Sequence, residues 1–179
     1  MLGFFIGRAP GVTLATVGIY GAALETAGGL RKVNQAFNPI FTPIIAGMTA
    51  TGDHQRAAAT YAQLAQWMLW ILLPLIGVIL LAGTAILLIY GPAFRAGAAW
   101  LAVIAFGCAT NSYVSFGETI IMVQRPALNL LHSTITCIVA ALANLLLIPR
   151  FGAMGAACAL LTAYLTQGLL RFIALRFVF

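Results

Sequence analysis

No charged residue occurs between Arg56 and Arg95 of this chain. A domain that folds in water carries about a quarter charged residues, so such a run is unsuited to a water-facing surface. The whole chain shows the same bias, with 63% hydrophobic residues, 7% charged residues and a mean hydropathy of +1.05. This pattern predicts an all-α fold, a polytopic bundle of transmembrane helices.

Spanning helices of about 20 apolar residues can be placed along most of the chain. We expect a partial helix at residues 1–7 and a loop at 8–11. Full spans are expected at about 17–48, 54–82, 97–124, 126–148 and from 153 onward, with a short segment ending at 90–92. Residues 1–179 therefore form one membrane domain with about five full spans.

Three local signals mark the ends and bends of the expected helices. Asp53 follows a Thr-Gly pair and is expected to cap the second span. Pro39 and Pro43 are expected to bend the first span, because proline removes a helical hydrogen bond.

The basic residues are scattered singly and are expected at membrane boundaries, which argues against a nucleic-acid partner despite the net charge of +6. One side is expected to carry Arg8, Arg95 and Arg150, and the other Arg56, Arg125, Arg171 and Arg176. This weak bias favours a cytoplasmic C-terminus.

The expected helix at 17–48 is unusually polar for a membrane span. At 100° per residue its polar side chains fall within an arc of about 140°. They are Glu25, Arg31, Lys32, Gln35, Asn38 and Thr42. A basic residue at the centre of a span costs about 2.5–3.5 kcal/mol on insertion scales. We therefore expect Arg31 and Lys32 to face a polar cavity or an anionic partner.

Two later helices each carry one polar face. Asn111, Ser115 and Glu118 are spaced i, i+4 and i+7 in the expected span at 97–124. The next span carries Asn129, His132, Ser133 and Thr136 on one face, with Asn144 near its edge. Three helices with one polar face each predict a shared polar interior with lipid outside.

Several of these polar residues have alternative roles. Ser115, Ser133 and Thr136 are expected to form hydrogen bonds between helices. Glu118 either pairs with a basic side chain or takes part in function, and His132 either lies at the interface or relays protons. A stripe of small residues should let the last helix pack closely, and it comprises Gly152, Gly155, Ala156, Ala159, Thr162 and Ala163.

Enzyme motifs are absent from the sequence. It has no phosphate-binding glycine loop, no HExxH and no GxSxG, and it contains only two histidines and three acidic residues. We therefore expect neither catalytic residues nor a metal or cofactor.

Four segments, in order, resemble a known membrane family. They are VGIYGAALETAGGLRKVNQAFNPIFTPIIAGMTATGD, IYGPAFRAGAAWLAVIAFG, MVQRPALNL and LIPRFGAMGAACAL. They are similar to segments of the polysaccharide (O-antigen-type, lipid-linked oligosaccharide) flippases, in the multidrug/oligosaccharidyl-lipid/polysaccharide exporter superfamily. The resemblance covers nearly the whole chain, although Val123-Gln124 stands where many relatives have Thr-Gly.

The resemblance implies a fold and an activity. Members of this family have a dozen or more helices in two pseudosymmetric lobes around a cavity. They move undecaprenyl-diphosphate-linked oligosaccharides across the bacterial inner membrane by alternating access. This chain would be the C-terminal lobe without most of its first helix, and an N-terminal lobe would be its partner, because half a cavity cannot alternate by rocking.

The family's cationic cavity suits the substrate's diphosphate and is matched here by Arg31 and Lys32. Other expected substrate-binding residues are Gln35, Asn38, Asn111 and Glu118. Two alternatives stay open. One is an ion-coupled multidrug antiporter of the same superfamily, with Glu25, Glu118 and His132 as coupling candidates. The other is a non-transporting module that only packs with a partner lobe.

Overall fold

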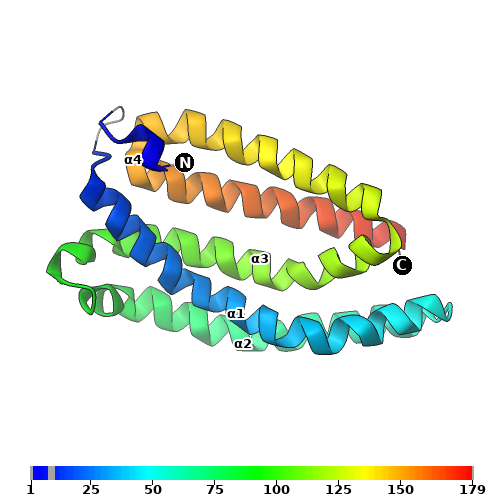
Figure 1. Cartoon of the computed structure of the whole chain (residues 1–179). Helices are drawn as coiled ribbons and strands as arrows, with labels where there is room; N and C mark the ends of the chain where they lie inside the picture. Colours follow the sequence, from blue (N-terminus) through cyan, green and yellow to red (C-terminus); the bar gives the residue numbers. More distant parts are fainter. Residues whose placement is uncertain (1, 8–10, 179) are drawn as a thin grey trace.

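The computed structural model of this chain is built of helices packed side by side (Figure 1). It describes residues 2–7 and 11–178, and within these ranges the side chains of residues 50, 54, 116, 119, 120, 123, 124 and 175–178 are left out. Most of the loop expected at 8–11 and the side chain of Arg176 thus lie outside the described residues. The expected all-α fold is confirmed for the part described.

Four long α-helices and two short 3-10 helices make up the fold. In chain order they are η1 (Leu2–Phe5), α1 (Leu14–Ala50), α2 (His54–Leu88), η2 (Pro92–Gly97), α3 (Ala98–Gln124) and α4 (Pro126–Val178). Thr13 caps α1, since its hydroxyl accepts a hydrogen bond from the Thr16 amide. Asp53 caps α2 by accepting from the Arg56 amide at 3.2 Å, so this predicted cap is confirmed.

The predicted end of the second span near residue 82 is wrong. Helix α2 continues without a break to Leu88, and no separate segment follows it before η2. Gly83 lies inside the helix, where the absence of a side chain lets Leu101 of α3 pack closely. A methyl carbon of Leu101 would lie 3.3 Å from a Cβ there. The chain instead turns at Gly91, where a positive φ of 131° suits glycine.

Helix α4 consists of two arms that meet at Gly152. That residue has φ 57° and ψ −130°, which no helix contains, and the chain reverses there (Figure 1). Just past the turn, a Cβ on Gly155 would overlap the Leu147 carbonyl of the first arm. Backbone therefore meets backbone at the closed end of this hairpin, which confirms the predicted turn at 149–152 and the close approach expected of the small residues.

Helix α3 is the central element. It lies between the α1–α2 pair and the hairpin of α4 (Figure 1). The largest buried cluster joins Leu101 and Ile104 of α3 to Ala27 of α1 and to Met68 and Leu72 of α2. The position of α1 relative to α4 is therefore set mainly by how each packs on α3.

Among the described residues, three helical segments are long and apolar enough to cross a membrane. They are Gln55–Leu88, Pro92–Ser115 and Pro126–Ala174, and their most apolar 18-residue windows have mean hydropathies of 2.7, 1.5 and 2.0. The last contains both arms of α4, and α1 is not one of the three despite its length. The expected five spans are therefore not confirmed. Large apolar side chains such as Leu81, 91% exposed, cover the outer surfaces as lipid contact requires.

The hairpin predicts a specific sensitivity at Gly155. Replacing Gly155 by Ala forces the two arms of α4 apart, because the new methyl overlaps the Leu147 carbonyl. We expect the variant to lose about 1–3 kcal/mol of stability, the usual cost of overpacking. Thermal unfolding of the purified protein in detergent measures this loss.

Gly77→Ala is the matched control. Gly77 lies inside α2 with no atom within 4 Å of an added Cβ, so alanine there should leave the melting temperature unchanged or raise it. Equal melting temperatures for Gly155→Ala and the wild type would contradict the backbone contact.

Candidate functional site

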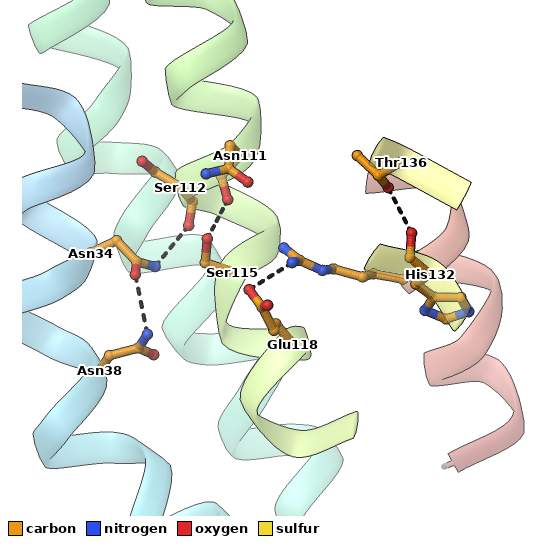
Figure 2. Close-up of polar contacts among 9 residues, drawn as sticks. Asn34, Asn38, Asn111, Ser112, Ser115, Glu118, His132 and Thr136 are labelled. Carbon is orange, nitrogen blue, oxygen red and sulfur yellow. Dashed lines mark hydrogen bonds and ion pairs between the residues drawn. The ribbon is translucent and has the colours of Figure 1, made fainter. Parts of the chain in front are cut away.

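A pair of buried polar residues joins α1 to α3. The Asn34 side-chain amide donates to the Ser112 carbonyl at 2.9 Å (Figure 2). The Ser112 hydroxyl donates to the Leu30 carbonyl at 3.2 Å. Asn34 and Ser112 are 5% and 1% exposed. These reciprocal bonds fix the register of the two helices, because breaking them leaves buried polar groups unpaired.

Asn38 extends this contact by one turn of α1. Its amide nitrogen donates to the Asn34 carbonyl oxygen at 3.2 Å (Figure 2). Its own carbonyl oxygen is buried and has no hydrogen-bond partner. Asn38, a predicted substrate-binding residue, therefore keeps a free acceptor next to the α1–α3 contact.

Arg31 lies toward α4. Its Nη2 atom lies 3.3 Å from the position of a Cβ on Gly28, so the side chain folds back along α1. Its guanidinium group lies close enough to the Tyr164 hydroxyl, on the second arm of α4, to act on it electrostatically. Arg31 is only half-buried. This predicted residue thus lies where α1 and α4 come together beside α3.

Three predicted residues of α1 lie on its outer side instead. Glu25, Lys32 and Gln35 are exposed. The reason is that Ala27 and Asn34 seat the helix on α3, which turns one flank of the polar stripe toward α4 and the other away from the bundle. The structure thus separates the adjacent residues Arg31 and Lys32.

The polar face of α3 follows the same side of the bundle. Asn111 and Ser115 lie at helical positions between Ser112, which contacts α1, and Gly107, which packs against Tyr164 of α4. Figure 2 shows Asn111, Ser115 and Glu118 along this helix beside Asn34. We call Arg31, Asn38, Asn111, Ser115 and Glu118 the polar layer.

Two of the expected interhelical hydrogen bonds are replaced by bonds within a helix. The Ser115 hydroxyl donates to the Asn111 carbonyl at 2.6 Å, and the Thr136 hydroxyl donates to the His132 carbonyl at 2.8 Å. Each hydroxyl donates its hydrogen bond to the backbone carbonyl four residues earlier in its own helix, which is a common alternative for serine and threonine.

Glu118 forms an ion pair with Arg171 at 2.6 Å, which joins α3 to the second arm of α4. This confirms that Glu118 pairs with a basic side chain. Arg171 is 2% exposed and lies inside the bundle. Its expected place at a membrane boundary stays a prediction, because burial among helices does not set its depth in the membrane. Glu118 satisfies only part of the guanidinium, since Nε and Nη1 of Arg171 are buried without hydrogen-bond partners.

His132 lies on the first arm of α4, away from α1 (Figure 2). It is 9% exposed, and its Nδ1 atom has no hydrogen-bond partner. It borders a pocket that also contains Arg125. Among the residues described, no three His, Cys, Asp or Glu side chains lie close enough to hold a metal ion.

Sequence reasoning missed four residues that shape this site: Asn34, Ser112, Tyr164 and Arg171. Asn34 could have been noticed, because it lies one helical turn before Asn38. The partners of the others lie far away in the chain, so no local pattern identifies them.

Comparison with known proteins adds no family assignment. No family model, no curated protein and no solved structure matches this chain. The resemblance to polysaccharide flippases therefore stays a prediction.

The Glu118–Arg171 pair predicts different responses at two glutamates. Glu118→Gln leaves the buried Arg171 charge unbalanced. We expect a loss of about 2 kcal/mol or more, because the 38% exposure of Glu118 reduces the 3–5 kcal/mol typical of a fully buried pair. Thermal unfolding in detergent measures the loss.

Glu25→Gln removes the same charge from an exposed position on α1 and should leave the melting temperature within about 1 °C of the wild type. Replacing Glu118 and Arg171 together by Gln and Met should recover most of the stability lost in the single variant. A double variant as unstable as Glu118→Gln would count against the ion pair.

Proposed function

We propose that this chain is one lobe of a transporter that moves lipid-linked oligosaccharides across the bacterial inner membrane by alternating access. In this proposal α1, α2, α3 and both arms of α4 cross the bilayer, and the C-terminus lies in the cytoplasm. The oligosaccharide carrier is undecaprenyl diphosphate, and the diphosphate is the part that the protein recognises.

The exposed polar flank of α1 is the observation that carries this proposal. Helix α1 packs within an otherwise apolar bundle, yet Lys32 and Gln35 point out of it near the middle of the helix. A polar flank at this depth is costly in lipid and favourable in a water-filled cavity. Secondary transporters place their binding sites at this depth, between two halves of the protein.

The residues near this flank suit a diphosphate carrying a sugar. Arg31 supplies a planar donor group that can bind phosphate oxygens in pairs, and Lys32 supplies a point charge. The side-chain oxygen of Asn38 is unpaired but buried, so it can accept a hydrogen bond from a sugar hydroxyl only in a conformation that uncovers it. Arg31 and Lys32 lie on different flanks of α1, so binding one diphosphate requires both flanks to border the same cavity. A second lobe packed along α1 would close that cavity.

Neutralising the two cations tests substrate recognition. In the double variant Arg31→Gln, Lys32→Gln, we expect affinity for undecaprenyl-diphosphate oligosaccharide to fall at least about tenfold, because charged hydrogen bonds to phosphate are lost. Native mass spectrometry of the purified protein, titrated with this lipid, measures the affinity.

The matched control removes two exposed cations elsewhere, in Arg95→Gln, Arg150→Gln. It should bind like the wild type. Equal affinities in all three proteins would refute recognition by Arg31 and Lys32. When the chain is expressed with a partner lobe, export should be lost in the first variant and kept in the control.

Cysteine labelling tests whether the α1 flank faces water. In protein whose native cysteines are replaced by alanine, Gln35→Cys should react with a membrane-impermeant maleimide in vesicles, because a cavity admits water. Leu142→Cys, also on an exposed face but among apolar residues of α4, should stay at least about tenfold less reactive in the lipid.

Equal and low reactivity at both positions would show that the α1 flank faces lipid. High reactivity at both would show that the hairpin of α4 lies outside the bilayer.

The Glu118–Arg171 pair favours one alternative function. A carboxylate that gives up a buried cationic partner on protonation can couple transport to a proton gradient, as an ion-coupled multidrug antiporter requires. Vesicles containing the assembled transporter distinguish the two. Proton-driven uptake of cationic drugs supports the antiporter, and movement of the lipid-linked sugar supports the main proposal.

A further inference from the structure

A pocket of about 420 Å³ lies at the open end of the α4 hairpin, opposite the turn at Gly152. The first arm contributes Leu128 and His132, and the second arm contributes Leu170, Ile173 and Ala174. Arg125, in the turn that joins α3 to α4, completes the lining. The pocket thus has apolar walls and two nitrogen-bearing side chains.

Two polar groups of this pocket have no partner among the described residues. Arg125 is exposed, and the described side chains show no ion pair for it. The imidazole of His132 is nine-tenths buried, and its Nδ1 atom has no hydrogen-bond partner. Leaving a buried polar atom unsatisfied is unfavourable, so an oxygen-bearing ligand in the pocket would be stabilising there.

The basic side chains in and behind the pocket favour an anion, and Arg125 is the one without an ion pair among the described residues. Arg171 lies close enough to His132 to act on it electrostatically, and two of its guanidinium nitrogens remain unpaired. Its partner Glu118 balances the charge from the far side, on α3. A ligand with negatively charged oxygens would therefore find Arg125 at the entrance and a hydrogen-bonding imidazole inside.

The depth and walls of the pocket indicate a lipid. The turn at Arg125 begins the apolar segment Pro126–Ala174, so the pocket lies near the end of a candidate span, at the depth of lipid headgroups. Basic pockets between membrane helices commonly bind anionic headgroups. The lining includes apolar surface from Leu128, Leu170 and Ile173. Burying the first carbons of an acyl chain against this surface is favourable, whereas the surface does not stabilise a free inorganic ion.

We propose that this pocket binds the phosphate headgroup of an anionic membrane phospholipid. Arg125 pairs with the phosphate, His132 donates a hydrogen bond to it, and the apolar walls hold the glycerol end of the acyl chains. This site is separate from the cations of α1 and does not depend on the transport function proposed above.

Lipid titration of the purified full chain tests this site. The probes are dioctanoyl phosphatidylglycerol, dioctanoyl phosphatidylcholine and inorganic phosphate, each added to protein in neutral detergent and followed by native mass spectrometry. We expect phosphatidylglycerol to bind at least about tenfold more tightly than phosphatidylcholine, whose choline cancels the phosphate charge. Inorganic phosphate should not displace it at equal concentration.

Two variants locate the binding. Arg125→Gln and His132→Gln should each weaken phosphatidylglycerol binding by about tenfold. Arg150→Gln, an exposed cation at the closed end of the same hairpin, should leave it unchanged. Arg125 is exposed, so its variant should fold even if the one at His132 does not.

Three outcomes would overturn the proposal: equal binding by Arg125→Gln and the wild type, an equal loss in Arg150→Gln, or displacement by inorganic phosphate at equal concentration. The Arg31→Gln, Lys32→Gln protein should keep the phospholipid. Failure of this site is therefore distinguishable from failure of the proposed transport function.

Discussion

The buried charge of Arg171 constrains the structure more than any other group described. A guanidinium removed from water needs a carboxylate beside it, so the second arm of α4 meets α3 where Glu118 lies. On its other side, α3 is held to α1 by the bonds between Asn34 and Ser112. Because polar contacts join α3 to α4 on one side and to α1 on the other, α3 sets the positions of both helices in the bundle.

The helices could be predicted from the sequence because their signals are local. Asp53 accepts a backbone hydrogen bond, and Gly152 adopts a conformation that favours glycine. The end of α2 was missed because the run without charge from residue 57 to 94 carries no clear signal for where one helix stops. The helix continues to Leu88, and the chain turns at Gly91.

The sequence predicts that these polar residues share one face of α1, but it does not predict which residues of other helices they contact. Helical periodicity shows that Arg31 and Lys32 share a polar face, whereas the seam that packs on α3 decides which of them turns toward α4. Arg171 looked like an interfacial residue because it lies near the end of the last helix. Its burial depends on Glu118 in another helix, and one sequence carries no signal for such a pair.

The ion pair also has a consequence for how the protein is made. Glu118 leaves the ribosome before Arg171, and at 5–20 residues per second the delay is about 3–10 s. During that time α3 has its carboxyl group but not its cation. The contact that holds the second arm of α4 against α3 therefore cannot form until the last helix has been made. We expect the bundle to reach its final packing only after synthesis of the chain has passed Arg171.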